Sequence, residues 1–318
     1  MITPGRLNDV RSFADLIVFL SDELDWPVGD LTIEGDAFDY EPEELGIDPA
    51  RAPKRPKRVA VYERIVQAPL SRVWENVYDW EHLPWLHRES FTSIDLEESG
   101  PWGWRARVGL PPVESGTSMQ IELLVDRAEQ RYVTRTVDGP GTGTEIWTRL
   151  AEASPTETAV VVEFHVPGLE DPASEAVGAA LARLYTRLWD QDESMIQERE
   201  RRAAGSSPKR PEDFFLGGRA ALRAELPKTV EFDGLRVRLE ERDGAVRAYS
   251  LVCPHWMGPL DVDAEDPGTL VCPWHGYRFN VRTGQSCDGR TFRLRSAPEV
   301  VVEAGEVFLR RGQGSDRR

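Results

Sequence analysis

The sequence has few cysteines and histidines and no long apolar run. Its 318 residues include three cysteines and five histidines. A secreted disulfide framework would normally carry an even and larger number of cysteines, so a disulfide-rich secreted protein is not expected. No apolar run approaches the ~20 residues of a membrane-spanning helix. The opening residues, MITPGRLNDVRSF, also lack the apolar core of a signal peptide. We therefore expect a cytoplasmic protein that does not enter a membrane.

Basic residues are also fewer than acidic residues. The chain has 39 lysines and arginines against 55 aspartates and glutamates, which gives a formal charge of −16. Such a charge repels the phosphate backbone, so nucleic acid is not an expected partner. Hydrophobic residues make up 40% and charged residues 30%, as in ordinary globular proteins, and the length suggests two domains.

The chain divides by pattern into four segments. Residues 1–57 form an N-terminal arm with one helical stretch, FADLIVFLSDEL, and an acidic and then a basic, proline-containing part. Residues 58–203 follow the order strand, short helix, many strands, long helix. The composition of RRAAGSSPKRPED predicts a linker, placed at 204–215, and residues 216–312 have all-β patterning. The fold class expected is α+β.

Alternation of apolar and polar residues predicts antiparallel, half-buried strands in the second segment. A strand VAVYERIVQ leads into a helix PLSRVWENVYDW, and a long helix covers about 174–202. In the last segment, Asp233-Gly234 and Asp243-Gly244 are dipeptides typical of hairpin turns. The strands expected between the two helices are 92–96, 104–108, 119–126, 132–137, 145–150 and 159–166.

The last segment contains two mixed cysteine–histidine pairs. Cys253 and His255 lie in LVCPHWMGPL, and Cys272 and His275 lie in LVCPWHGYRF, with sixteen residues between His255 and Cys272. In a Rieske-type [2Fe–2S] cluster two thiolates hold one iron and two imidazoles the other, so each of two loops supplies one of each. Tetrahedral zinc is the alternative, but zinc fingers usually pair Cys with Cys and His with His, the latter on a helix. We predict the cluster.

A second histidine pair lies in YDWEHLPWLH. It has the spacing Asp79-x2-His82-x4-His87. Non-haem Fe(II) oxygenases bind iron with two histidines and one carboxylate, which leaves positions open for O2 and substrate. Pro84 between the histidines is expected to end or bend the helix, so that His87 approaches from another direction. Histidines that merely line a pocket in a metal-free ligand-binding domain are the alternative.

The carboxylate is expected from the long helix, whose apolar stripe is Val177, Leu181, Leu184 and Leu188. Asp192 occupies the next position of that stripe. A carboxylate on an inward face is costly unless it is paired or ligated, so Asp192 is the predicted third ligand. Asp190, about 200° from Leu188 around the helix, should be solvated. Asp190 and Glu193 are weaker candidates, and a surface charge run is the alternative for the whole stretch.

These motifs resemble those of Rieske non-haem iron oxygenases. Residues 217–311 resemble the Rieske domain in the proline after each cysteine, in CPWHG and in YRFNVRTGQ, and residues 58–203 resemble the START-like helix-grip superfamily that contains the catalytic domain. The resemblance implies iron ligation by His82 and His87, with Asp192 fitting the late helical carboxylate. It implies that Asp79 hydrogen-bonds an iron-ligating histidine and passes electrons from the cluster.

The domain order departs from that family, in which the Rieske domain comes first. In the family, electrons usually cross between neighbouring subunits of a trimer, and whether this chain forms a homotrimer or transfers electrons within one chain stays open. The implied cofactors are a [2Fe–2S] cluster and a mononuclear Fe(II). The implied partners are O2, a small apolar or aromatic substrate, and a separate flavin/NAD(P)H reductase or ferredoxin, because no nucleotide fingerprint is evident.

The sequence is therefore compatible with three functions. The first is an oxygenase that hydroxylates or demethylates its substrate. The second is an electron-transfer or redox-sensing protein whose helix-grip domain binds a ligand or partner without catalytic iron. The third is a helix-grip cyclase or lipid carrier with a vestigial cluster loop. Iron stoichiometry separates the first two, at about three against about two atoms per chain.

Overall fold

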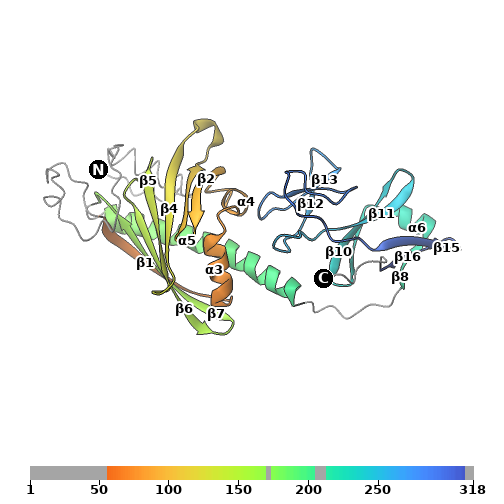
Figure 1. Ribbon diagram of the computed structural model, residues 1–318, viewed down its shortest axis with the longest axis horizontal. Helices are drawn as coiled ribbons and strands as arrows, with labels where there is room; N and C mark the ends of the chain where they lie inside the picture. The colour runs from red at the N-terminus through yellow and green to blue at the C-terminus, as the bar shows by residue number, and fades with distance from the viewer. Residues whose placement is uncertain (1–55, 170–172, 205–212, 312–318) are drawn as a thin grey trace. The chain divides into compact units, whose positions relative to one another are not determined.

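The computed structural model of the chain describes residues 56–169, 173–204 and 213–311. The chain divides into two compact units, residues 1–194 and 195–318, and the division falls within the long helix. The helical stretch expected in the N-terminal arm lies outside the described residues. Each unit is described by itself (Figure 1).

The first unit contains one seven-stranded antiparallel sheet. Its strand order is β1-β7-β6-β5-β4-β3-β2, so only the pairing of β1 with β7 joins strands that are distant in the sequence. Each of the other neighbours is connected by a hairpin or a short turn. The strands are β1 Lys57–Val66, β2 Ser93–Gly100, β3 Gly103–Gly109, β4 Ser118–Asp126, β5 Arg131–Asp138, β6 Glu145–Ser154 and β7 Glu157–Val166.

Alternation along these strands produces one apolar face. In β7 every second side chain from Thr158 to Val166 is buried, while the intervening residues are partly exposed. Successive side chains of a strand point to opposite faces, so the buried set lines one side of the sheet. The strands lie where this periodicity predicts them, and β2 and β6 extend further than expected into polar turns.

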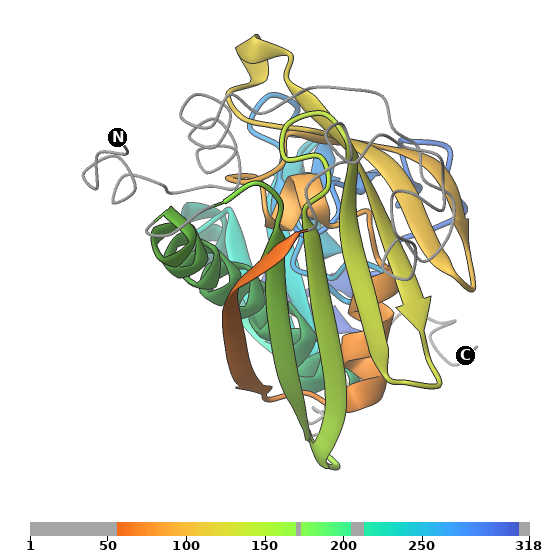
Figure 2. The ribbon, with the colours of Figure 1, turned by 90° about the vertical axis from the view of Figure 1, so that its left-hand side faces the viewer.

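Among the described residues of the first unit, α-helices precede and follow the strands β2 to β7. The helices α3 (Leu70–Tyr78) and α4 (Leu83–Leu86) follow β1, and a short 3-10 turn, Val113–Ser115, links β3 to β4. The long helix α5 (Ala173–Ala203) follows β7. In Figures 1 and 2 the strands form one curved sheet and α5 runs along one of its faces.

Close contacts fix α5 against β1 and β7. A Cβ at Gly178 would lie 2.5 Å from the carbonyl oxygen of Val59, so only glycine permits this approach of helix to strand. About two turns further on, the ring of Tyr185 meets Phe164 edge-on at a centroid distance of 4.7 Å. The first half of α5 is thereby held along the strands that carry the apolar face.

The second unit is built from short strands in three small sheets. Their orders are β11-β10-β9, β12-β13-β14 and β15-β16-β8, all antiparallel. The expected hairpin turns are present, with positive φ at Asp233 and Gly234 and at Asp243 and Gly244. The elements are β8 Asp213–Gly218, α6 Arg219–Ala224, β9 Lys228–Phe232, β10 Leu235–Arg242, β11 Ala245–Ser250, β12 Asp261–Val262, β13 Thr269–Val271, β14 Arg278–Asn280, β15 Glu299–Glu303 and β16 Glu306–Arg310.

One difference from the sequence prediction concerns the linker. Residues 213–215 were assigned to it, but they open strand β8, which pairs with β16. Asp213 is the last residue of the polar stretch RRAAGSSPKRPED and forms an ion pair with Arg310 on the neighbouring strand, while Phe214 and Phe215 continue β8. The core of this part of the unit consists of Leu222, Phe232, Val237, Leu239, Val307 and Leu309.

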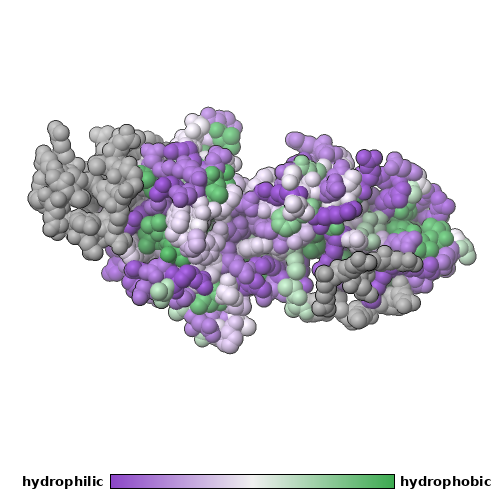
Figure 3. All heavy atoms as spheres, viewed as in Figure 1, coloured by the Kyte–Doolittle hydropathy of each residue, from purple (hydrophilic) through white to green (hydrophobic). Residues whose placement is uncertain are grey.

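The α+β fold class is confirmed. A sheet packed against a long helix is followed by short strands and one short helix, α6. No helix in the described part of the chain has the length and apolarity to cross a bilayer. Figure 3 shows hydrophilic residues over most of the visible face, with hydrophobic residues in scattered patches. This surface agrees with the 30% of charged residues in the sequence.

Candidate metal centres

The first centre begins where helix α3 ends. Asp79 caps α3, and the next turn leads into the four-residue helix α4, which His82 precedes and His87 follows. Pro84 lies in the first turn of α4, where its missing N–H costs nothing, so it starts a helix rather than ending one. The break between α3 and α4 nevertheless gives the two histidines different directions of approach, as expected.

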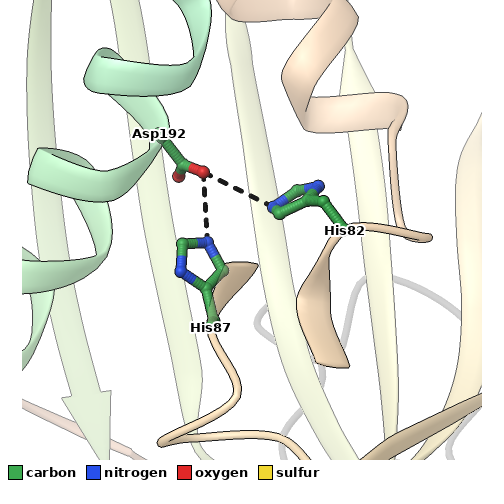
Figure 4. A group of neighbouring side chains, drawn as sticks. All are labelled: His82, His87 and Asp192. Atoms are coloured by element: carbon green, nitrogen blue, oxygen red, sulfur yellow. Dashed lines mark hydrogen bonds and ion pairs between the residues drawn. The ribbon is translucent and has the colours of Figure 1, made fainter. Parts of the chain in front are cut away.

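Asp192 of α5 lies between the two imidazoles (Figure 4). Its Oδ1 is 3.1 Å from His87 Nε2 and 3.5 Å from His82 Nε2, and the imidazole rings stand at 75° to one another. One ligand atom from each residue lies within 4.8 Å of the other two. All three are buried, with 3–8% of their surface exposed. The structure thus brings together the three predicted ligands.

The other acidic residues of this turn are occupied elsewhere. Arg64 of β1 donates from Nε to Glu193, at 3.0 Å, and from Nη1 to Asp190, at 2.7 Å. Glu193 also accepts the backbone N–H of Gln67. These contacts fix the rotation of α5 and turn Asp192 alone toward the histidines. Asp190 and Glu193 are therefore not the ligands that the geometry favours.

The hydrogen bonds of His87 indicate that this centre requires a cation. His87 Nδ1 lies 2.7 Å from Gln191 Oε1, and an amide oxygen can only accept, so the proton is on Nδ1. In the neutral imidazole Nε2 is then an acceptor, yet it faces the carboxylate oxygen of Asp192. Two acceptors at this distance need a cation between them, either a second proton on the ring or a metal ion.

The protonation equilibria reflect the same geometry. Burial alone would lower the pKa of His87, but the charge and hydrogen bond of Asp192 outweigh it, and the pKa stands above its ordinary value. Burial alone would raise the pKa of Asp192, but the two histidines and a hydrogen bond from Asn76 bring it below its ordinary value. A negative carboxylate facing two imidazoles is a donor set that a divalent cation satisfies.

Further side chains surround these ligands. Asp79 Oδ2 lies 3.4 Å from His82 Nδ1, on the side of the ring away from Asp192. Burial raises the pKa of Tyr132 and of Tyr185, and the charge of Asp192 adds to both shifts. Sequence reasoning missed Gln191, Asn76 and the two tyrosines; for Gln191, its position next to Asp192 was an available signal.

The second centre is formed by two loops of the second unit. The first follows β11, where the Cys253 N–H donates to the Gly258 carbonyl, and the second joins β13 to β14, where the Cys272 N–H donates to the Tyr277 carbonyl. A Cβ at Gly258 would lie 2.7 Å from the Trp274 ring and 3.0 Å from Cys272 Sγ. Only glycine therefore allows the two loops to approach this closely.

The loops bring the four predicted cluster ligands together in two pairs. The rings of His255 and His275 meet at a centroid distance of 4.6 Å and 79°. The thiols of Cys253 and Cys272 influence each other's ionisation. This interaction and the nearby His275 lower the pKa of Cys272 to about 5, while the same interaction and burial raise the pKa of Cys253.

The spacing of these donors bears on the zinc alternative. Tetrahedral zinc needs all its donor atoms within about 4 Å of one another, given metal–ligand distances near 2.0–2.3 Å. In the part of the chain that the structure describes, only His82, His87 and Asp192 bring three such atoms within 4.8 Å of one another. Two thiols in one pair and two imidazoles in another fit the two irons of a Rieske cluster better than one ion.

Aromatic side chains enclose the imidazole pair. Tyr277 stacks on His255 at 4.7 Å and 23°, and the guanidinium of Arg290 lies 4.2 Å from the centre of the Tyr277 ring. Trp256 lies beside both imidazoles, and Phe292 contacts His255 and Tyr277. This enclosure limits access of water to the histidine side of the centre.

The class of the second unit follows from a family match. Residues 214–297 match the Rieske [2Fe-2S] domain family, which implies a [2Fe–2S] cluster in this part of the chain. The match covers the four cluster ligands and the aromatic residues around them. The chain therefore contains a Rieske domain, and the domain match together with the relatives below supports electron transfer as its role.

The curated relatives match between a fifth and about a quarter of this chain. The ferredoxin component of an alkene monooxygenase system from Xanthobacter autotrophicus is 32% identical over 74 residues, 23% of this chain and 60% of the relative. The ferredoxin component of a p-cumate 2,3-dioxygenase system from Pseudomonas putida is 38% identical over 69 residues, 21% and 58% respectively. Human apoptosis-inducing factor 3 is 31% identical over 83 residues, 26% and 14%. The chain thus spans less than two thirds of each.

Solved structures similar to this chain include the ZhuI aromatase/cyclase from Streptomyces sp. R1128, at 18% identity and a TM-score of 0.39, covering 46% of this chain and 98% of that one. A START superfamily protein from Mycobacterium smegmatis is 18% identical with a TM-score of 0.36, covering 43% and 97%. Nothing about activity follows from likenesses at this level.

Proposed function

We propose that this protein is a Rieske-type non-haem iron oxygenase. It would use O2 and electrons from a separate reductase or ferredoxin to hydroxylate or demethylate a small apolar or aromatic substrate. The observation that supports the proposal most directly is the buried set of His82, His87 and Asp192, carried by the same chain as a Rieske domain. Two histidines and one carboxylate are the ligands by which such oxygenases hold Fe(II).

In this proposal the residues of the first unit would bind the metal ion, orient one of its ligands and pass electrons to it. His82 and His87 would hold Fe(II) through Nε2 and Asp192 through Oδ1, the atoms that already face one another. Ferrous iron held there supplies the one-electron chemistry that activates O2. Asp79, 3.4 Å from His82 Nδ1, would orient that ring and carry electrons toward the site.

The residues of the second unit would deliver the electrons. Cys253 and Cys272 would hold one iron of the cluster, and His255 and His275 the other. In a hydroxylation, one oxygen atom of O2 enters the substrate and the other leaves as water, with two electrons and two protons supplied. A homotrimer, in which the cluster of one subunit serves the mononuclear iron of its neighbour, is part of the proposal and is tested by the molar mass in solution.

Iron and sulfide content test the proposal. The anaerobically purified protein should contain about three irons and two acid-labile sulfides per chain, with a Rieske EPR signal after reduction by dithionite. His82→Ala should lower the iron content to about two without changing the sulfide or the EPR signal. Full turnover and unchanged iron content in His82→Ala would falsify the assignment of the mononuclear site.

A second candidate is an electron-transfer or redox-sensing protein. The observation in its favour is that two of the curated relatives are ferredoxin components of oxygenase systems, and that residues 214–297 match the Rieske domain family. In that function the first unit would bind a ligand or partner without catalytic iron. Two irons to two sulfides per chain, unchanged after anaerobic reconstitution with Fe(II), would favour it over the oxygenase.

A further inference from the structure

Both ring nitrogens of His87 are held by consecutive residues of helix α5. Gln191 Oε1 lies 2.7 Å from Nδ1, and Asp192 Oδ1 lies 3.1 Å from Nε2. Neighbouring residues of a helix point about 100° apart, so their side chains reach opposite edges of the ring rather than the same atom. Helix α5 therefore contacts the His87 imidazole at both edges, although Gln191 lies 104 positions from His87 in the sequence.

The helix that provides this grip is itself fixed in rotation. Arg64 binds Glu193 and Asp190, the residues on either side of the Gln191–Asp192 pair. Glu193 also accepts the Gln67 backbone N–H at 2.9 Å. Since α5 cannot turn about its axis without breaking these contacts, Gln191 and Asp192 keep their positions relative to His87.

The two histidines have partners of different charge on their Nδ1 sides. His82 Nδ1 faces the carboxylate of Asp79, at 3.4 Å, whereas His87 Nδ1 faces a neutral amide at 2.7 Å. A carboxylate partner draws the Nδ1 proton strongly and makes the other nitrogen a better metal ligand. An amide oxygen fixes the same tautomer and orientation but adds no negative charge.

We propose that Gln191 is the positioning residue for His87. Its amide oxygen accepts the Nδ1 proton and thereby directs the Nε2 lone pair at the ion, beside Asp192. This inference rests on the proposed function, which places a divalent ion between His82, His87 and Asp192.

Metal affinity of substituted full-length protein tests the inference. The chain, with its cluster oxidised and its mononuclear metal removed, is titrated with Co(II) by calorimetry, and the EPR spectrum of bound Co(II) is recorded. Gln191→Leu, which has no acceptor, should weaken Co(II) binding by about 10–100-fold and alter the Co(II) spectrum. Gln191→Glu keeps an acceptor and should retain or tighten binding. The control is Gln197→Leu, another half-buried glutamine of α5, which should leave both readouts unchanged.

The outcomes separate this inference from the proposed function. Co(II) binding by the native chain that is lost in His82→Ala, together with unchanged affinity in Gln191→Leu, overturns the role of Gln191 and leaves the metal site standing. Weak binding in both Gln191→Leu and Gln191→Glu overturns the acceptor role, since a carboxylate also accepts. Absence of Co(II) binding by the native chain overturns the metal site and, with it, this inference.

Discussion

The two candidate metal centres differ in how far apart in the sequence their proposed ligands lie. The proposed cluster ligands fall within residues 253–275, on two loops anchored by short strands of one small unit. The ligands proposed for the mononuclear site come from the turn after α3 and from α5, and Asp192 lies 105 positions after His87. One centre is a local arrangement, and the other exists only once a sheet has closed around a helix.

This difference should make the two centres unequally sensitive to substitutions far from their ligands. The loop geometry at the cluster depends on hydrogen bonds and glycines within a few residues of the ligands. The proposed mononuclear site depends on the rotation of α5 about its axis. Arg64 fixes that rotation from β1, the strand at one edge of the sheet. Substitutions far from the ligands should therefore perturb the mononuclear site more readily than the cluster.

The largest expected effect comes from removing one cluster ligand. Cys272→Ser should eliminate the Rieske EPR signal and lower the iron content from about three to about one per chain, because a cluster cannot form without both thiolates. The mononuclear ion should stay. Cys287→Ser is the control, since the third cysteine is exposed and lies outside the ligand pattern. A normal Rieske spectrum in Cys272→Ser would show that the ligand assignment is wrong.

The next effect isolates the other centre. Asp192→Asn keeps the shape of the side chain but removes the charge that binds the cation, so iron should fall from about three to about two per chain with sulfide unchanged. Iron and sulfide analysis checks this. The matched control is Asp190→Asn on the same turn, which pairs with Arg64 at an exposed position. Equal iron loss in the two variants would mean that the long helix presents a different carboxylate.

Breaking the distant support should act on stability as well as on the metal. Arg64→Met leaves Glu193, whose side chain is 10% exposed, without its cationic partner. Removing one partner of a buried ion pair typically lowers the free energy of unfolding by about 3–5 kcal/mol. Chemical denaturation monitored by tryptophan fluorescence measures this loss, and metal titration should show weaker binding.

A surface pair on the same strand serves as the comparison. Arg58 pairs with Glu163 with 58% of the arginine side chain exposed. Arg58→Met should therefore change the free energy of unfolding by about 0–1 kcal/mol. Equal losses from the two arginine substitutions would contradict the view that Arg64 supports the mononuclear site specifically.

Effects confined to one unit should come from one methyl group added in each unit. Gly178→Ala places a Cβ against the Val59 carbonyl and should lower the free energy of unfolding by about 1–3 kcal/mol without altering the Rieske EPR signal. Gly258→Ala places a Cβ against Trp274 and Cys272 and should shift that signal while metal affinity at the mononuclear site stays unchanged. A Rieske shift in Gly178→Ala would show that the two centres are not independent.

Much of the fold followed from periodicity. The strands and helices of residues 58–203 lie where alternation and the helical stripe predict them, and the hairpin turns at Asp233-Gly234 and Asp243-Gly244 are present. The boundaries were less accurate where polar residues extend a strand, as at the β6–β7 hairpin. In that stretch the backbone is paired, but the side chains carry no alternation that marks it.

By itself the sequence determined the cysteine–histidine spacing of the cluster loops and the inward position of Asp192 on its helix. Both are local properties, since short-range spacing and the 3.6-residue period hold whatever the rest of the chain does. Only the tertiary structure decided that Arg64 occupies Asp190 and Glu193 and that Gln191 grips His87 from the edge opposite Asp192. Those contacts join residues more than a hundred positions apart, and their geometry depends on how β1 and α4 meet α5 after the sheet has curved.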